Sequence, residues 1–175
     1  YHRNSGTANS ALLVQVSPAD WGGDVLGGIA FQRALEERAY RLGGGDYRAP
    51  VQSVGDFLTG RTGTRDFFVT PTYAPGVRIA NLHAILPSEC AASLARALTF
   101  WETRVPGFGA ADVPLTGVES RSSAPCRIVR DAVTMESVSA AGLYPIGEGA
   151  GYAGGIMSAS LDGLKAVLAF LDKIQ

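Results

Sequence analysis

A glycine-rich segment near the end of the sequence has the spacing that proteins use to hold a phosphate or the edge of a cofactor ring. Gly149, Gly151 and Gly154 satisfy the pattern G-x-G-x-x-G. Glycines at this spacing permit a tight turn, bring backbone N–H groups close to a ligand and let the following helix pack closely. The N-terminus of that helix adds partial positive charge. The segment is therefore a candidate ligand-binding loop.

The same glycines also have a purely structural explanation, which stays open at this point: glycine permits a helix to cross a strand closely. The dinucleotide-binding form of the motif continues through a second strand to an acidic residue that binds the ribose. Here Asp172 falls within the helix that follows the glycines. The loop is therefore not the first dinucleotide-binding turn of a Rossmann domain.

A polar stretch upstream offers side-chain donors to a substrate carboxylate or to a cofactor. Its members are Arg121, Ser122, Ser123 and Arg127. Turn formation and surface ion pairs are the alternative explanation for these residues. The catalytic residues stay unknown from the sequence.

Two further residues have reactive side chains without a partner placed by the sequence. Cys126 is either a redox thiol or a small core residue beside Ile128. His83 is either an acid–base group or a structural residue. His2 and His83 give no metal-ligand spacing, and no serine lies in a G-x-S-x-G elbow. We therefore expect no metal site and no hydrolase.

The glycine loop must be positioned by the elements on either side of it. Leu143–Ile146 has the composition of a short strand, and an amphipathic helix is predicted after the loop. The apolar residues of that helix recur at spacings of four and three: Met157, Leu161, Leu164, Leu168 and Leu171. The sequence thus predicts a strand, a glycine loop and a helix in succession.

Upstream, apolar periodicity predicts two more helices, one over Ile29–Leu42 and one that begins at Ser88 as N-cap and runs past Trp101. The region between Gly44 and Asn81 is predicted to be mostly loop, with one turn of helix near Ser53–Leu58. Short strands are predicted at Ala11–Val16, Leu115–Glu119 and Cys126–Val129. We expect the first of these strands to pair with the other two. The predicted fold class is α+β, with a small, mostly antiparallel sheet packed with about three helices.

Composition limits the classes of function. The chain has 175 residues, of which 46% are hydrophobic and 18% charged, so it can bury a core. The formal net charge of −1 gives no reason to expect nucleic acid or an anionic membrane as a partner. The two cysteines form no disulfide framework, and no run of eighteen apolar residues occurs. We expect a cytoplasmic protein without a membrane span.

Four stretches of the sequence resemble one protein family. The segment Gly142–Ala159 is similar to the C-terminal flavin-contacting signature of the uncharacterised FAD-dependent dehydrogenases, a large family of NAD/FAD-utilising flavoproteins. The other similar stretches are Asn9–Val16, Gly43–Gln52 with Val54–Phe57, and Thr116–Ile128. Together they extend over essentially the whole chain.

The resemblance implies a set of cofactor-binding residues in the glycine loop. Glu148 matches an acid that binds the ribityl or pyrophosphate region of FAD, although such proteins often have Asp there. The helix N-terminus would face the pyrimidine edge of the flavin. The remaining residues match the backbone part of the site: Gly147, Gly149, Gly151, Tyr152, Gly154 and Gly155.

The resemblance also implies a division of labour. Residues 1–130 would form an inserted, substrate-type domain, and residues 131–175 would return to complete a Rossmann domain for FAD. The partner would be an N-terminal Rossmann half of the same protein, and the first residue, Tyr1, suggests a fragment. We expect a C-terminal fragment of an FAD-dependent oxidoreductase, inactive alone, with an unknown small-molecule substrate.

Two alternatives belong to other classes of function. One is a freestanding module that binds a small anion without redox chemistry, and the other is an interaction domain that uses the long segment between Gly44 and Asn81. If the final strand and helix lack their native sheet, apolar surface is exposed along Met157, Leu161 and Leu164. A homodimer that buries this face is a further expectation.

Overall fold

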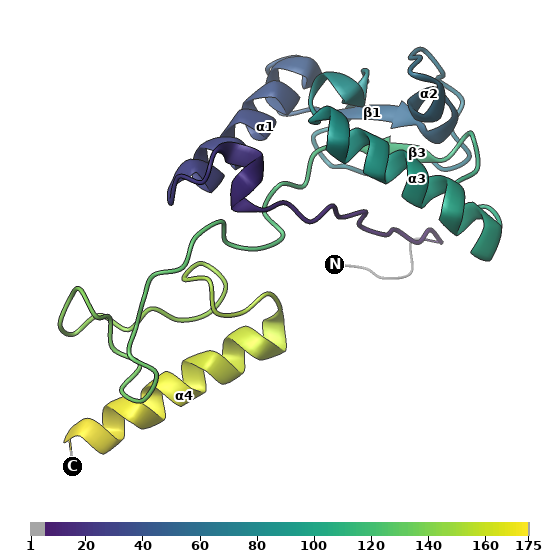
Figure 1. The fold of residues 1–175 in the computed structure, drawn as a ribbon. Coiled ribbons are helices and arrows are strands. Elements are labelled where there is room, and N and C mark those ends of the chain that lie inside the picture. Colours follow the sequence, from purple (N-terminus) through teal and green to yellow (C-terminus); the bar gives the residue numbers. More distant parts are fainter. Residues whose placement is uncertain (1–5, 175) are drawn as a thin grey trace. The chain divides into compact units, whose positions relative to one another are not determined.

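The computed structural model describes residues 6–174 and divides the chain into two compact units (Figure 1). Unit 1 comprises residues 6–16 and Arg33–Ser120, and unit 2 comprises Ser17–Gln32 and residues 121–174. One boundary therefore falls within helix α1 (Gly27–Gly43). These two units are defined by contacts within the chain. The predicted functional domains, residues 1–130 and 131–175, stay a prediction.

A three-stranded mixed sheet forms the centre of unit 1. Strand β1 (Ala49–Ser53) lies between β2 (Val77–Ile79) and β3 (Pro114–Thr116). It pairs in parallel with β2 and antiparallel with β3, so that Val51 lies opposite both Ile79 and Thr116. The fold class is α+β as predicted, but the expectation of a mostly antiparallel sheet is wrong because one of the two pairings is parallel.

The central strand is buried although it contains a proline and a glutamine. Pro50 cannot donate to the ladder, and it stands at the end of the β1–β3 pairing, where its carbonyl accepts from the amide of Gly117 at 3.0 Å. Gln52 is 1% exposed. Its side-chain oxygen accepts from the amide of Leu82 at 2.9 Å, and its amide nitrogen donates to the carbonyl of Arg61. The glutamine thus connects the strand to the loop after α2 (Val54–Thr59) and to the segment that begins at Leu82.

Helix α2 (Val54–Thr59) follows β1 directly. The Ser53 hydroxyl caps it by accepting from the amide of Asp56 at 3.1 Å, and Gly60 ends it in the left-handed conformation. The predicted turn of helix near Ser53 is confirmed. The expected loop between Gly44 and Asn81 also contains β1 and β2, which proline and glycine concealed in the sequence.

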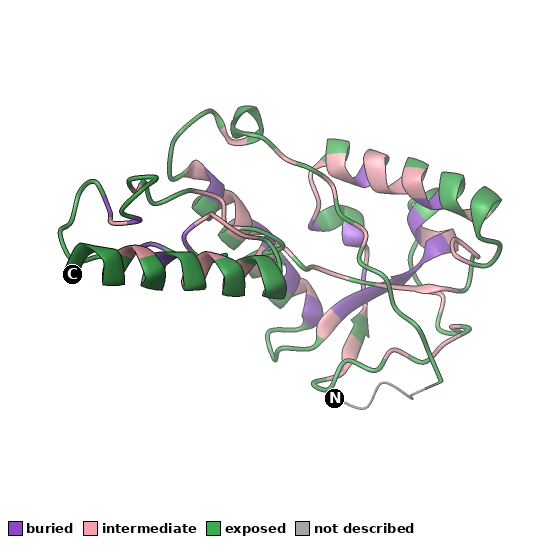
Figure 2. Cartoon of the chain, turned by 90° about the horizontal axis from the view of Figure 1, so that it is seen from below, coloured by how far each residue is buried: buried purple, intermediate pink, exposed green. Residues whose placement is uncertain are grey.

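Helix α3 (Ser88–Arg104) lies over one face of the sheet, where Ala91 and Leu98 are buried (Figures 1 and 2). The predictions of α1 and α3 are confirmed. The N-cap of α3 is Pro87, so the assignment of Ser88 as N-cap is wrong by one residue. Before α3, the short 3-10 helix η2 (Leu82–Ala84) is capped by Asn81.

Unit 2 contains the 3-10 helix η1 (Pro18–Trp21), the start of α1, and helix α4 (Ile156–Ile174). Turns and bends form most of the chain between residues 121 and 155. The predicted strands Cys126–Val129 and Leu143–Ile146 are wrong, and so is Ala11–Val16 in unit 1. The last alternates in exposure like a strand, but it has no partner strand among the described residues. Of the predicted strands, only the one beginning at Leu115 occurs, as β3.

Helix α4 is apolar and exposed along most of its length, as Figure 2 shows in green. Met157 is 81% exposed, and Leu161 and Leu164 are more than half exposed. The expected apolar surface is therefore present. In the part of the chain that the structure describes, no helix is both long and apolar enough to cross a membrane.

We expect Gln52→Leu to lower the free energy of unfolding of unit 1 by about 1 to 3 kcal/mol, because it leaves the buried amide of Leu82 without a partner and removes the bond to the carbonyl of Arg61. Urea unfolding followed by Trp101 fluorescence, with Trp21 replaced by Phe, measures the change. The matched control is Gln15→Leu at an exposed position of the same unit. Equal midpoints for the two variants would contradict the assigned role of Gln52.

Candidate functional site

The glycine loop is a compact turn held onto α4. The amide of Tyr152 donates to the carbonyl of Gly147 at 3.0 Å, and the amide of Gly151 donates to the carbonyl of Glu148 at 2.9 Å. The amide of Gly147 donates to the carboxylate of Asp162, on α4, at 2.9 Å. These three bonds fix the path of the chain from the loop toward the helix.

The fold requires glycine at one position of this loop and leaves room for a side chain at three others. Gly151 has φ +82°, and a Cβ there would lie 2.6 Å from the carbonyl oxygen of Cys126. Only glycine fits such a position, so its reason lies within the folded chain. Gly149 and Gly154 have neither a positive φ nor any atom within 4 Å of an added Cβ. At Gly155 the nearest atom is the Ser158 hydroxyl oxygen, at 3.7 Å. These three open glycines are exposed in the segment that leads into α4 (Ile156–Ile174).

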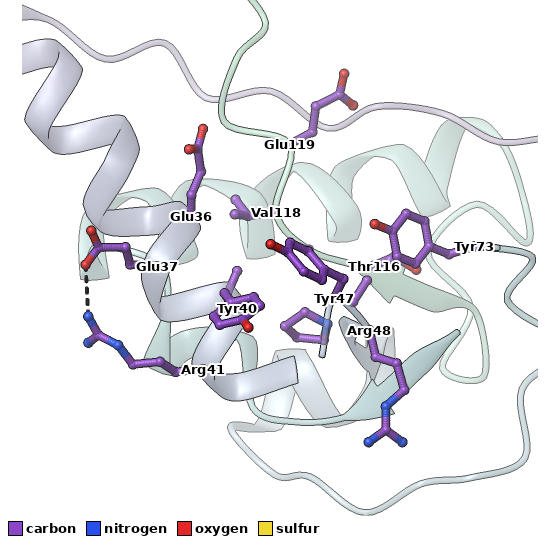
Figure 3. A pocket seen from close by; sticks show the side chains of 14 residues that line it. Glu36, Glu37, Tyr40, Arg41, Tyr47, Arg48, Tyr73, Thr116, Val118 and Glu119 are labelled. Atoms are coloured by element: carbon purple, nitrogen blue, oxygen red, sulfur yellow. Dashed lines mark hydrogen bonds and ion pairs between the residues drawn. The ribbon is translucent and has the colours of Figure 1, made fainter. Parts of the chain in front are cut away.

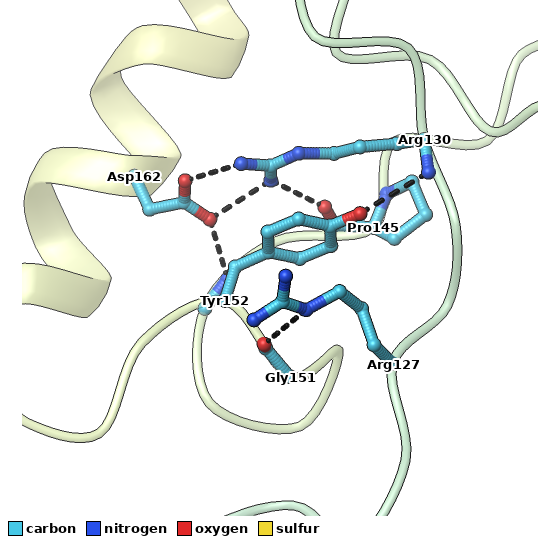
Figure 4. Close-up of polar contacts among 7 residues, drawn as sticks. Arg127, Arg130, Pro145, Gly151, Tyr152 and Asp162 are labelled. Carbon is cyan, nitrogen blue, oxygen red and sulfur yellow. Dashed lines mark hydrogen bonds and ion pairs between the residues drawn. The ribbon is translucent and has the colours of Figure 1, made fainter.

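A buried ion pair supports the loop from behind (Figure 4). The guanidinium of Arg130 and the carboxylate of Asp162 approach to 2.6 Å, with side chains only 9% and 12% exposed. Arg130 also donates to the carbonyl of Pro145 at 2.7 Å. The hydrogen bond from Arg130 lowers the pKa of Asp162 to about 2, with further help from the amide of Gly147. The same pairing raises the pKa of Arg130.

The ring of Tyr152 lies between two arginines (Figure 4). The guanidinium carbon of Arg130 is 3.6 Å from the ring centroid, and that of Arg127 is 4.8 Å away. The Tyr152 hydroxyl accepts from the backbone amide of Arg130 at 3.1 Å, and Arg127 donates to the carbonyl of Gly151 at 2.9 Å. Cation–π contacts of this kind stabilise by about 0.5 to 2 kcal/mol. The Tyr152 side chain therefore fastens the loop to the rest of unit 2.

The structure places the other candidate residues as follows. The Glu148 side chain is exposed beside the open glycines. The carbonyl of Ser123 accepts from the side-chain Nε2 of Gln32 at 3.3 Å. The Nε2 atom of His83 lies 2.8 Å from the carbonyl oxygen of Phe57, and the two rings are stacked, which is a structural role. Cys126 is a free, partly buried thiol. In the described chain, no three His, Cys, Asp or Glu residues are grouped to hold a metal ion.

The sequence did not reveal the partnership of Arg130 and Asp162, because the two residues are 32 positions apart and no local pattern connects a turn to a helix face. It also did not reveal a pocket of about 860 Å³ in unit 1, between α1 and the sheet (Figure 3). Its lining includes three tyrosines, three glutamates and two arginines: Tyr40, Tyr47, Tyr73, Glu36, Glu37, Glu119, Arg41 and Arg48.

Two comparisons with known proteins give matches that cover different lengths of the chain. A family model described as "FAD-dependent protein, C-terminal domain-like" matches residues 1–122. An uncharacterized protein of Clostridium beijerinckii is 45% identical over 175 residues, which is 99% of this chain and 33% of that protein. The family match ends before the glycine loop, whereas the similarity to the clostridial protein includes it. The chain spans about a third of the length of this relative.

We expect Asp162→Asn to lower the free energy of unfolding of unit 2 by about 2 to 3 kcal/mol, because Arg130 then stays buried without a counter-charge. Urea unfolding followed by Trp21 fluorescence, with Trp101 replaced by Phe, measures this effect. Asp172→Asn, an exposed acid on the same helix, is the control. An unchanged midpoint for Asp162→Asn would show that the ion pair adds no stability.

The pH dependence of this effect follows from the pKa of Asp162. The pKa of about 2 in the folded protein is below the usual aspartate value of 3.8, so the carboxylate contributes its full stability above pH 3.8 and loses it as the pH falls toward 2. We expect the stability difference between wild type and Asp162→Asn to shrink by about 2 kcal/mol between pH 5 and pH 2. Asp131 and Glu136 also have lowered pKa values, so only the difference between the two proteins isolates Asp162. A difference that stays constant with pH would contradict the assignment.

Proposed function

Because the chain belongs to the family of FAD-dependent protein C-terminal-like domains, we propose that it is the C-terminal part of an FAD-dependent oxidoreductase, a dehydrogenase. In such an enzyme the flavin accepts the hydride, and the protein supplies binding, orientation and electrostatics. The share of the clostridial relative that the chain covers supports a larger parent protein. We propose that the 175 residues alone are inactive and that the substrate is a small molecule.

The observation that carries the proposal is the open backbone at Gly149, Gly154 and Gly155. Nothing in the described chain requires glycine at these positions, since an added Cβ would meet no atom closer than 3.7 Å. A glycine without a reason inside the fold is explained when an outside group must approach the backbone closely. The neighbouring α4 N-terminus offers N–H groups and partial positive charge to that group. These features fit the pyrophosphate or the electron-rich ring edge of FAD.

The loop residues would then divide the work between contact and support. The amides of Gly149 and Gly154 would donate to the cofactor, whereas the amide of Gly155 donates to the Ser158 hydroxyl at 3.1 Å. The exposed carboxylate of Glu148 would accept from the ribityl hydroxyls of the cofactor. Gly147, Gly151 and Tyr152 would hold the loop in shape through the bonds described above. This arrangement keeps donors fixed before the ligand arrives, which lowers the entropic cost of binding.

The cofactor domain would be completed from outside the chain. We propose that residues 131–175 add α4 and its loop to an N-terminal Rossmann half, and that residues 1–130 form an inserted, substrate-type domain. The exposed apolar residues of α4, such as Met157 and Leu161, would pack on that half. In the isolated chain the same face would favour homodimers, because burying it removes apolar area from water.

A pair of glycine substitutions in the protein encoded by the complete gene tests the proposed site. Gly149→Val adds a side chain into open space, so we expect an unchanged unfolding midpoint of the isolated 175-residue chain. In the complete protein we expect at least a tenfold lower content of bound flavin, and a lower midpoint only to the extent that the lost flavin stabilised it. Gly151→Ala clashes inside the loop, so we expect a lower unfolding midpoint. The measurements are the visible absorption spectrum and thermal unfolding of each purified protein.

The controls separate a flavin site from an anion site. We expect the isolated chain to show no tight FAD binding, since an N-terminal half would supply the remaining contacts. If the complete protein carries no flavin, while phosphate binds the chain and Gly149→Val abolishes that binding, the loop belongs to an anion-binding module instead. Full flavin content in Gly149→Val would remove the loop from the cofactor site.

A further inference from the structure

We propose that the pocket of unit 1 between α1 and the sheet binds a small organic cation, such as a substituted ammonium group. This inference goes beyond the proposed flavin site, because the pocket is formed by residues of unit 1 alone. Its volume of about 860 Å³ is within the range of small-molecule sites. The argument rests on the backbone at Tyr47, on the aromatic lining and on the distribution of charge.

Tyr47 has a backbone conformation that its side chain does not favour. Its φ is +65°, in the left-handed region where glycine is the usual residue. The preceding turn does use glycine at such angles, with φ +110° at Gly44 and +76° at Gly45. Two residues after Gly45, the chain has a tyrosine at the next left-handed position, where a glycine would avoid the strain. Strained residues of this kind concentrate at ligand-binding sites.

Burial does not explain why the tyrosine is there. Met135, the other described non-glycine residue with a positive φ, is 7% exposed and has its side chain in the core of unit 2. Tyr47 is 73% exposed, so its ring gains little from burial. The ring instead lies edge-on to Tyr40, with a centroid separation of 5.1 Å, at the pocket. We therefore attribute the strained backbone of Tyr47 to the position of its exposed ring at the pocket.

The lining offers aromatic surface from three separate segments. Tyr40 is on α1, Tyr47 lies in the turn before β1, and Tyr73 lies in the loop before β2 (Figure 3). All three are exposed, at 42%, 73% and 48%. The faces of aromatic rings attract cations, and cages of such rings recognise substituted ammonium groups. An exposed group of tyrosines around a concave site is thus suited to an organic cation.

The charges at the pocket disfavour an anion. Arg41 is paired with Glu37 at 2.9 Å, and Arg48 is paired with Asp46 at 2.7 Å. Both guanidiniums are therefore already matched by a carboxylate. Glu119 adds a further exposed carboxylate to the lining. The pocket thus combines tyrosine rings with excess negative charge, which is the combination that a cation requires.

Two probes of equal shape test the role of charge. Choline and its neutral carbon analogue, 3,3-dimethylbutan-1-ol, are titrated into the 175-residue chain, with binding followed by NMR line broadening of the probe. We expect choline to bind saturably and the neutral analogue at least tenfold more weakly. Equal binding of the two probes, absence of saturable choline binding, or binding of inorganic phosphate in place of choline would each overturn the proposal.

Variants then assign the binding to this pocket. We expect Tyr47→Ala to weaken choline binding at least tenfold and Glu119→Gln at least twofold, since an exposed charge is partly screened. The matched control is Phe68→Ala, which removes a 77% exposed ring outside the pocket and should leave binding unchanged. Equal losses for Tyr47→Ala and Phe68→Ala would place the binding elsewhere.

The strain supplies a second readout. We expect Tyr47→Gly to lose choline binding while its urea midpoint stays equal to that of the wild type or rises, because glycine relieves the left-handed conformation. A lower midpoint for Tyr47→Gly would show that the tyrosine serves stability, and it would overturn the argument from strain. This test needs no flavin, so its outcome is independent of whether the glycine loop binds FAD.

Discussion

The ion pair between Arg130 and Asp162 is the contact on which the organisation of unit 2 depends. This unit has little regular structure between residues 121 and 155, so no strand ladder holds the turns in place. One guanidinium binds the carboxylate on α4, the carbonyl of Pro145 and the face of Tyr152 together. The carboxylate in turn binds the amide of Gly147. Such a network is costly to break, because each charge is already desolvated.

Unit 1 is held together by a different physical principle. Its centre is the buried strand β1, and the residues that follow it, Val54 and Phe57, are at most 2% exposed. Apolar burial and backbone pairing therefore dominate there. The buried polar side chain of Gln52 bonds the backbone groups of Leu82 and Arg61, which lie outside the sheet. A ligand site at the edge of this sheet can include strained residues because the core beneath it is well packed.

Sequence patterns predicted the elements whose stability is local. The helical periodicity of α1, α3 and α4 was sufficient, and the turn of helix expected near Ser53–Leu58 occurs as α2. The strands were predicted poorly because pairing depends on distant partners. β1 contains Pro50 and follows three glycines, whereas the more strand-like Ala11–Val16 finds no partner strand in the described chain. For the same reason the G-x-G-x-x-G spacing located the candidate loop, but the supporting pair 32 residues apart and the tyrosine pocket became visible only in three dimensions.

Each of the two candidate sites contains a residue that the fold itself does not explain. Gly151 is a glycine that the fold requires, whereas Gly149 is a glycine that the fold leaves unexplained. Met135 is a strained residue that burial explains, whereas Tyr47 is a strained residue that burial leaves unexplained. A residue that lowers the stability of the fold and makes no compensating contact within it is explained by a ligand that binds there. The backbone of the glycine loop would receive a cofactor, and the rings of the pocket would receive a cation.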